Sequence, residues 1–287
     1  MSDDNKLDGN EYKKTAQEGW QKVAPGWHKW VPFISDLLQE ETNQMLEMAH
    51  IRSGHRVLDI AAGDGDQSIL AAHRVGHEGY VLATDLSSNL LAYAAESAKK
   101  AGLNNLETKV MDAENLELED AAFDAVICRL GLMLMPNIDA ALGEIYRVLK
   151  SKGRLSAIIF SAPDKNPWFS IPLKIATKHA QPSAPQLVQP GIFSLDAPGV
   201  FSGVLTTAGF QKIEVNYLTA TINLASAAEC IEFLYDTAGA IHTILADLSE
   251  TEQQEAWEEM EHALKEFETP EGFESPVETI LAAGQKP

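Results

Sequence analysis

The stretch VLDIAAGDGDQS, residues 57–68, decides the fold class of this chain. An apolar run ends on Asp59, a loop containing Gly63 and Gly65 follows, and helix-forming sequence comes next. A strand, a glycine turn and a helix in this order are typical of an α/β unit whose loop cradles the phosphates of a nucleotide. This loop carries three aspartates, which would repel a phosphate. The pattern therefore predicts a loop of the nucleotide-binding type whose ligand presents no phosphate to it.

The sequence around this loop alternates short apolar runs with amphipathic, helix-like segments. The expected strands lie at residues 55–61, 79–85, 105–112, 123–129, 153–160, 211–224 and 277–284. Helical spacing separates the first five, which indicates parallel pairing through right-handed crossovers. We predict an α/β fold: a doubly wound, mostly parallel, seven-stranded Rossmann-like sheet, with a helical N-terminal segment and an insertion after the fifth strand.

Local signals place several helix ends. Ser88 is the expected N-cap of a helix that closes on Gly102. Residues 195–210 are expected to form a helix that stops at Gly209, and Ser249 with Glu252 has the spacing of a capping box. We expect a single domain of four segments. They are a helical lid (1–50), a ligand-binding core (51–160), a proline-rich substrate-side insertion (161–196) and the rest of the sheet with added helices (197–287).

Composition and charge disfavour several classes of partner. The 287 residues include 42 acidic and 22 basic side chains, a formal net charge of −20. A nucleic-acid binder needs a cluster of basic side chains, and the strongly negative net charge of this chain opposes binding to a polyanion. No apolar run approaches the ~20 residues that span a bilayer, and the acidic start differs from a secretory signal. We expect a cytoplasmic protein with no nucleic-acid partner and no membrane span, whose monomeric or homodimeric state stays open.

Three of the expected parallel strands end in an acidic residue, namely Asp59, Asp85 and Asp112. One such residue alone could simply cap the following turn. Ligands of open parallel sheets bind beyond the carboxyl ends of the strands, so three acids on consecutive strands would form a row of hydrogen-bond acceptors there. A matching ligand offers an ammonium group, a ribose diol and an amino-bearing base.

These motifs resemble those of class I S-adenosylmethionine-dependent methyltransferases, and most closely the ubiquinone/menaquinone-biosynthesis group. That family's first motif is an acid followed by three alternate glycines; here Asp59, Gly63 and Gly65 match and Ala61 replaces the first glycine. The other matching segments are ATDLS (83–87), MDAENLEL (111–118), FDAVICRLGLMLMPN (123–137) and EIYRVLKSKGRL (144–155). The resemblance covers over a third of the chain and implies S-adenosylmethionine as cofactor and S-adenosylhomocysteine as product.

The resemblance implies roles at the methionine end of the cofactor. Asp59 would anchor the loop and accept from the methionyl ammonium, directly or through water. Ala61 and Gly63 would leave room for close approach of the backbone. Arg129 ends the fourth strand, and its carbonyl would lie near the ammonium. Its side chain is a candidate for the methionyl carboxylate, with a structural ion pair as the alternative.

At the nucleoside end, the resemblance implies that Asp85 accepts from both ribose hydroxyls and that Leu86 packs on the adenine. Asp112 would accept from the adenine amino group, beside the Ala113 amide.

Two alternatives remain open. Asp85 lies 20 residues after Gly65, where a dinucleotide-binding Rossmann domain keeps its ribose-binding acid. However, Ser68 stands where that fingerprint has its third glycine, and the loop aspartates oppose a pyrophosphate. A nicotinamide-dependent oxidoreductase is therefore the weaker interpretation. The other alternative is a subunit that binds S-adenosylmethionine without catalysis.

The acceptor is expected to be a small apolar or aromatic molecule, methylated at O, N or C by in-line displacement. Trp20, Trp27 and Trp30 would form either an aromatic lid or a helix face packed on the core, and Met133 and Met135 would line the acceptor pocket or pack in the core. The candidate bases are His28 and His242. No metal site is expected.

Overall fold

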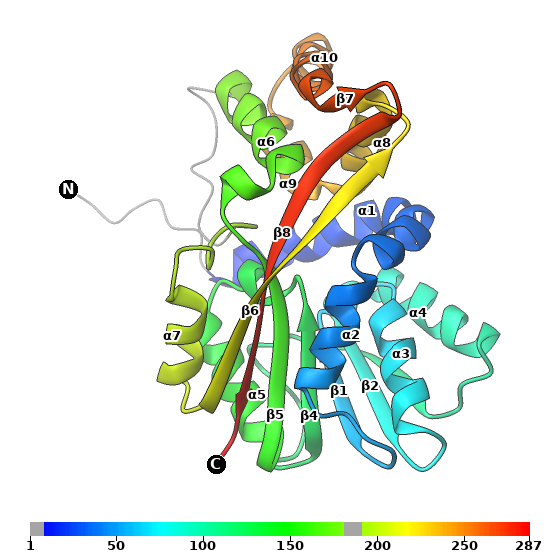
Figure 1. Cartoon of the computed structure of the whole chain (residues 1–287), viewed down its shortest axis with the longest axis vertical. Coiled ribbons are helices and arrows are strands. Elements are labelled where there is room, and N and C mark those ends of the chain that lie inside the picture. Colours follow the sequence, from blue (N-terminus) through cyan, green and yellow to red (C-terminus); the bar gives the residue numbers. More distant parts are fainter. Residues whose placement is uncertain (1–8, 181–190) are drawn as a thin grey trace.

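The computed structural model describes residues 9–180 and 191–287, with side chains from Tyr12 onward. Within these residues the strands form one sheet in the order β3-β2-β1-β4-β5-β8-β6, and the short β7 pairs with β8 (Figure 1). The strands are β1 (Arg56–Ile60), β2 (Tyr80–Asp85), β3 (Leu106–Val110), β4 (Phe123–Arg129), β5 (Leu149–Phe160), β6 (Gln211–Leu224), β7 (Glu268–Thr269) and β8 (Gly272–Gln285). Strands β1 to β5 pair in parallel, and β8 runs antiparallel to both β5 and β6. The predicted fold class is confirmed, with β7 as an additional strand.

Helices cover both faces of the sheet (Figure 1). One face carries α2 (Gln39–Met48), α3 (Asp66–Val75) and α4 (Ser88–Lys100), and the other carries α5 (Ile138–Val148) and α7 (Val200–Thr207). Strand β4 shows why both faces are covered: Val126 packs in one apolar cluster and Ile127 in the other, each fully buried. A continuous apolar strand needs cover on both sides, which crossover helices supply.

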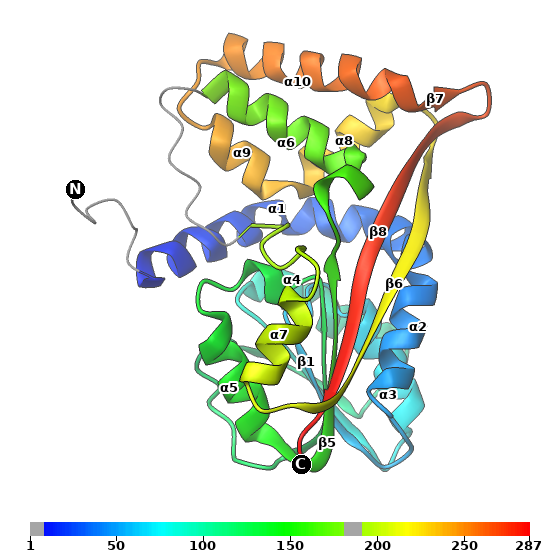
Figure 2. The same ribbon diagram turned by 60° about the vertical axis from the view of Figure 1, so that its left-hand side comes forward.

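The remaining helices form a second layer beyond the carboxyl ends of the parallel strands, which we call the cap (Figure 2). It consists of α1 (Gly9–Leu37), α6 (Pro167–Ala180), α8 (Ala227–Thr237), α9 (Gly239–Leu245) and α10 (Glu250–Leu264). Strands β5, β6 and β8 extend upward into the cap, while α1 lies between the other cap helices and the parallel strands (Figure 2). The cap therefore stands over the sheet edge where the acidic strand ends lie.

Several local predictions can now be compared with the structure. The capping box of Ser249 and Glu252 is present at the start of α10. The N-cap of α4 is Ser87 rather than Ser88, because the Ser87 side chain accepts from the amide of Leu90. Helix α7 begins only after Gly199, whose φ of +81° separates the preceding turn from the helix, so its expected start at 195 was too early.

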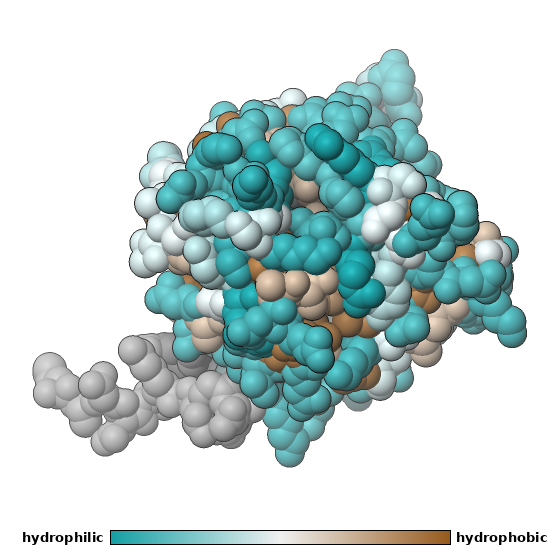
Figure 3. Space-filling model, turned by 90° about the horizontal axis from the view of Figure 1, so that it is seen from below, coloured by the Kyte–Doolittle hydropathy of each residue, from teal (hydrophilic) through white to brown (hydrophobic). Residues whose placement is uncertain are grey.

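The segment boundaries stay predictions, because parts of two segments lie outside the described residues. These parts are residues 1–8 of the expected lid and 181–190 of the expected insertion. Among the described helices, none combines the length and apolar character needed to cross a bilayer. The end of the molecule opposite the cap is largely hydrophilic with small apolar areas (Figure 3).

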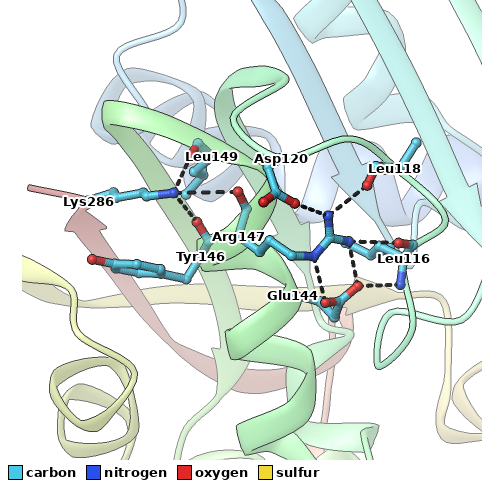
Figure 4. A network of polar contacts seen from close by, with 8 residues as sticks. All are labelled: Leu116, Leu118, Asp120, Glu144, Tyr146, Arg147, Leu149 and Lys286. Carbon is cyan, nitrogen blue, oxygen red and sulfur yellow. Dashed lines mark hydrogen bonds and ion pairs between the residues drawn. The ribbon is translucent and has the colours of Figure 1, made fainter.

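A polar network fixes the connection between β3 and β4 (Figure 4). The Arg147 guanidinium on α5 donates to the carbonyls of Leu116 and Leu118, and pairs with Glu144 and Asp120 at 2.7–2.8 Å. These bonds hold the segment that follows Asp112 against α5. The position of Asp112 at the sheet edge thus depends on a neighbouring helix as well as on its strand.

Candidate functional site

The loop between β1 and α3 has a left-handed backbone at three alternate residues. The φ angles are +53° at Ala61, +57° at Gly63 and +81° at Gly65. A side chain added at Gly65 would lie 2.7 Å from the Cβ of Ala94 on α4, whereas one added at Gly63 would meet nothing within 4 Å. Gly65 therefore allows two helices to pack closely, and Gly63 leaves its backbone open for a ligand to approach.

Ala61 occupies a conformation that usually favours glycine, and the structure accommodates it through Gly131. A Cβ at Gly131 would lie 2.5 Å from the Cβ of Ala61 and 2.8 Å from the Sγ of Cys128. The glycine that the sequence motif lacks at position 61 is thus present across the loop, after β4. The Ala61 side chain fills space against a neighbouring loop and leaves the ligand side of Gly63 open.

Asp85, at the end of β2, connects the loop between β1 and α3 to the loop between β2 and α4. Its carboxylate accepts from the amide of Gly63 at 2.9 Å and from the amide of Ser87 at 2.8 Å, and only 8% of the residue is exposed. Burial raises the pKa of Asp85, while these amide bonds oppose the rise. Each oxygen makes one such bond and keeps acceptor capacity for a further donor.

Asp59, at the end of β1, lies behind the glycine loop. Its carboxylate is fully buried and accepts from the Ser68 hydroxyl and, at 3.4 Å, from the Gln67 amide. Burial raises the pKa of Asp59 to about 7, although both hydrogen bonds lower it. This position supports the predicted anchoring of the loop. Contact between Asp59 and a methionyl ammonium stays a prediction.

Asp112 lies two residues beyond the end of β3, which stops at Val110 and not at 112 as expected, on a more open part of the edge. It accepts from the amide of Glu114 at 2.9 Å and pairs with Lys13 of α1 at 2.7 Å. Lys13 also pairs with Glu114 at 2.6 Å. The neighbouring Ala113 is half-buried. A residue of the cap therefore already contacts the acid that is predicted to bind the adenine.

The side chain of Arg129 forms a structural ion pair. Its guanidinium pairs with Asp66 at the start of α3 and donates to the Thr42 hydroxyl of α2 at 3.0 Å. Burial opposes ionisation of Asp66, but the guanidinium holds the pKa of Asp66 below its ordinary value. Of the two alternatives for Arg129, the structure favours the ion pair over a carboxylate-binding role. The pair fixes the start of α3 and hence the end of the glycine loop.

Helix α1 contacts the loops that follow β1, β2 and β3 through polar side chains spaced along the helix. Besides the Lys13 contacts, Gln17 donates to the carbonyl of Leu86 at 2.9 Å, Gln21 pairs with Ser88 at 3.1 Å, and His28 bonds Asp64 at 2.8 Å. Leu86 itself is half-buried. The part of α1 from Lys13 to His28 therefore lies along the whole predicted cofactor edge, as a lid would.

The two candidate bases lie apart from each other. The Nδ1 of His28 bonds Asp64, and its ring stacks on Tyr93 of α4 at 4.0 Å between ring centroids. His242 lies in the cap, where its Nε2 bonds the carbonyl of Tyr235 and its ring contacts Tyr235 and Trp257. Both histidines thus have local partners that account for their positions. A catalytic role for either stays a prediction.

The N-terminal tryptophans bind α1 to α8. The Trp30 indole donates to Asp236 at 2.8 Å, and the Trp27 indole donates to the carbonyl of Thr237 at 3.2 Å. Trp20 packs edge-on against Trp27 at 5.9 Å. For Trp27 and Trp30 the structure favours the packing alternative over an aromatic lid.

Sequence reasoning missed an aromatic cluster inside the cap. Its buried or partly buried members come from five separate elements or loops and pack mostly edge to face at 5.3–6.3 Å: Trp30, Phe33, Phe160, Trp168, Phe169, Phe193 and Phe233. Met133, from the loop after β4, is buried beside it, and Met135 is half-buried. No fixed spacing in the sequence links these residues, because the tertiary fold alone brings them together.

Comparison with known proteins agrees with this geometry. The family model described as a methyltransferase domain matches residues 51–188. The demethylmenaquinone methyltransferase of Listeria welshimeri is 33% identical over 150 residues, covering 52% of this chain and 64% of that protein. A ubiquinone/menaquinone biosynthesis C-methyltransferase of Rhizobium leguminosarum is 34% identical over 181 residues, covering 59% and 69%. The chain thus spans a little under two thirds of the length of the Listeria relative.

Two solved structures share the fold at low identity. Haemonchus contortus phosphoethanolamine N-methyltransferase 2, solved with S-adenosylhomocysteine, has a TM-score of 0.59 at 18% identity, covering 98% of this chain and 61% of that one. The [4+2]-cyclase SpnF has a TM-score of 0.55 at 18% identity, covering 93% and 96%.

Strand order, glycine loop and acidic edge together define a Rossmann-like methyltransferase domain. With the sequence relatives, this geometry shows that the chain belongs to the class I S-adenosylmethionine-dependent methyltransferases and is similar to their ubiquinone/menaquinone-biosynthesis group. Among the residues that the structure describes, no cluster of three or more His, Cys, Asp or Glu side chains could hold a metal ion.

Proposed function

We propose that this chain transfers a methyl group from S-adenosylmethionine to a small aromatic acceptor. The observation that carries the proposal is the open backbone at Gly63, bonded to the buried carboxylate of Asp85. The loop offers space for close approach, and the strand ends beside it carry the carboxylates of Asp59, Asp85 and Asp112. Lys13 and Arg129, which lie beside them, are held in ion pairs with Asp112 and Asp66. This charge suits a ligand with an ammonium group and hydroxyls but no phosphate.

The predicted cofactor contacts follow from the positions of these acids. Asp85 would accept from the ribose hydroxyls with its remaining lone pairs, and Leu86 would pack on the base. Asp112 and the Ala113 amide would bind the adenine edge, with Lys13 close enough to compete for Asp112. The Gly63 backbone and the Arg129 carbonyl would face the methionyl group. The bound cofactor supplies an activated methyl group on a sulfonium.

The residues of this chain would act mainly by positioning and by excluding water. Helix α1 closes over the loops through Lys13, Gln17 and His28, and the buried aromatic cluster of the cap lies beyond the same sheet edge. Holding the acceptor in line with the methyl group lowers the entropic barrier of the transfer. A ring with oxygen substituents is electron-rich at carbon, and the proton that its methylated carbon must lose would pass to water or to a nearby base. We therefore propose a quinol-like ring methylated at carbon as the acceptor, as the names of the relatives suggest.

The test separates this proposal from its alternatives. Calorimetric titration should show binding of S-adenosylmethionine and no binding of NAD; the opposite result overturns the proposal. Release of S-adenosylhomocysteine with reduced naphthoquinones as acceptors should then show turnover. Binding without turnover across a broad panel of acceptors would instead support a non-catalytic subunit.

The Asp85→Ala variant should bind S-adenosylmethionine about 100-fold more weakly, because it loses two charge-assisted hydrogen bonds and the tether to Gly63. The control is Asp247→Ala, which removes an exposed carboxylate between α9 and α10 and should leave binding unchanged. Circular dichroism should show both variants folded. An unchanged affinity in Asp85→Ala would contradict the ribose assignment.

A further inference from the structure

Three buried polar side chains inside the cap have no hydrogen-bond partner among the described residues. They are the indole nitrogen of Trp168 and the hydroxyls of Ser275 and Thr279. Trp168 is 5% exposed, and both hydroxyl residues are fully buried. Buried donors without a partner are rare in folded proteins, and each calls for an explanation. The second residue of α6 and the upper part of β8 therefore contain polar groups that the described residues leave unsatisfied.

The position of Trp168 relative to β8 is fixed by Asn166. The side-chain amide of Asn166 donates to the carbonyl of Glu278 at 3.0 Å, and its oxygen accepts from the amide of Glu278 at 3.1 Å. This paired contact continues the sheet past the end of β5. Trp168 follows two residues later on one side of the contact, and Thr279 is the next residue on the other. The two unpartnered groups are thus attached to one rigid junction.

Ser275 and Thr279 share the face of the sheet that the cap covers. They are four residues apart on β8, so their side chains point to the same side. In the sheet register Thr279 lies opposite Phe160 and Ser275 opposite Ile222, both buried. The face is therefore apolar except for these two hydroxyls.

The surroundings of the Trp168 ring offer the indole N–H nothing to bind. Its ring neighbours are Phe160 at 5.8 Å, Phe169 at 5.5 Å and Phe233 at 5.9 Å. This site adjoins the cofactor edge, because the amide of Phe160 contacts the sulfur of Met133, in the loop directly after β4, at 3.5 Å. The Trp168 indole therefore combines aromatic ring neighbours with a strong hydrogen-bond donor that no described residue satisfies.

We propose that the Trp168 N–H, assisted by the Thr279 hydroxyl, binds an oxygen substituent on the ring of the methyl acceptor. This inference rests on the proposed function and names the residue that would select the acceptor. The donor distinguishes a hydroxylated or carbonyl-bearing ring from a plain hydrocarbon ring, since only the former satisfies the buried N–H. A site built around a polar partner rejects analogues that lack it. Trp168 is in this sense a specificity residue and not a proton-transfer group.

The test compares two probes that differ only in oxygen, 1,4-dihydroxynaphthalene and naphthalene, under anaerobic conditions with saturating S-adenosylhomocysteine. The wild-type protein should bind the dihydroxy compound about tenfold more tightly. Trp168→Phe keeps a large ring but removes the N–H, and should reduce this ratio to about two while leaving naphthalene affinity nearly unchanged. Thr279→Val should lower the ratio by a smaller factor. The matched control is Trp257→Phe, which changes a tryptophan on the outer side of the cap and should preserve the ratio.

Nuclear magnetic resonance supplies a readout that a purely structural role would not move. The chain has five tryptophans, so the indole N–H signal lost in Trp168→Phe identifies this residue. That signal should shift downfield with 1,4-dihydroxynaphthalene but not with naphthalene. An unchanged affinity ratio in Trp168→Phe, a signal that stays in place, or a wild-type protein without preference each overturns the inference. Failure to bind S-adenosylhomocysteine would instead overturn the proposed function.

Discussion

The edge of the parallel sheet and the interior of the cap are the two regions that we propose face a ligand, yet they are built differently. At the edge, carboxylates such as Asp85 bond directly to backbone amides, so a few residues close in sequence to the strand ends fix the site. In the cap, rings from distant segments pack together, and Trp168 has no polar partner there. A backbone-defined site is encoded locally, whereas a packing-defined site depends on the whole fold.

Helix α1 belongs to both regions and connects them. Its polar side chains from Lys13 to His28 contact the loops at the sheet edge, whereas Trp27 and Trp30 bind it to α8. Substitutions along this one helix therefore separate what the sheet edge and the cap each contribute to stability and activity.

The largest expected effect is at the crossing of α1 and α8. A Cβ at Gly26 would lie 2.1 Å from the backbone oxygen of Asp236, so Gly26→Ala must push the helices apart. We expect a loss of more than about 3 kcal/mol in the free energy of unfolding, measured by urea denaturation.

The matched control is Gly19→Ala on the same helix, where a Cβ meets nothing within 4 Å. It should stabilise the protein by about 0.5–1 kcal/mol, because alanine favours a helix over glycine. If the two variants had equal stability, the close crossing would not be a structural requirement.

The next largest expected effect is the pH dependence of stability that is caused by Asp59. Burial raises the pKa of Asp59 to about 7 in the folded protein, against an ordinary value of 3.8. The folded state therefore holds a proton that the unfolded state releases, and this group makes stability fall as pH rises from about 4 to 7. Between pH 5 and pH 8, wild type should lose about 2–3 kcal/mol relative to Asp59→Asn. Parallel pH profiles for the two proteins would contradict the assignment.

A smaller effect tests how the edge tolerates Ala61. Gly131→Ala should lower the free energy of unfolding by about 2 kcal/mol, because the added Cβ would clash with the Cβ of Ala61 and with the sulfur of Cys128. Adding Ala61→Gly removes one of these clashes and a left-handed alanine, so the double variant should recover about 1 kcal/mol. Additive losses in this double-mutant cycle would show that the two positions do not interact.

The smallest effect is expected at His28, which joins lid and edge. Its side chain is 40% exposed, so breaking its bond to Asp64 in His28→Gln should change stability by less than about 1 kcal/mol. The rate of methyl transfer should change less than about threefold if the contact between His28 and Asp64 is only structural. A loss of 100-fold or more in turnover, with cofactor affinity preserved, would instead identify His28 as a general base.

The parallel strands, the glycine loop and the acidic residues near the strand ends were all predictable from the amino-acid sequence. The period of apolar residues and the chemistry of Gly63 and Gly65 are local properties, so they can be read without knowing the rest of the fold. The same locality explains why the capping box of α10 was predicted correctly, while the N-cap of α4 was misplaced by one residue between two adjacent serines.

Only the tertiary structure decided what the edge residues contact and how the cap is filled. It paired Arg129 with Asp66, placed Gly131 against Ala61, and brought Lys13 to Asp112 across 99 positions of sequence. These contacts depend on how helices cross the sheet and on which side chains fit together at close packing. No short-range pattern encodes that information, because packing is a property of surfaces that meet only once the chain has folded.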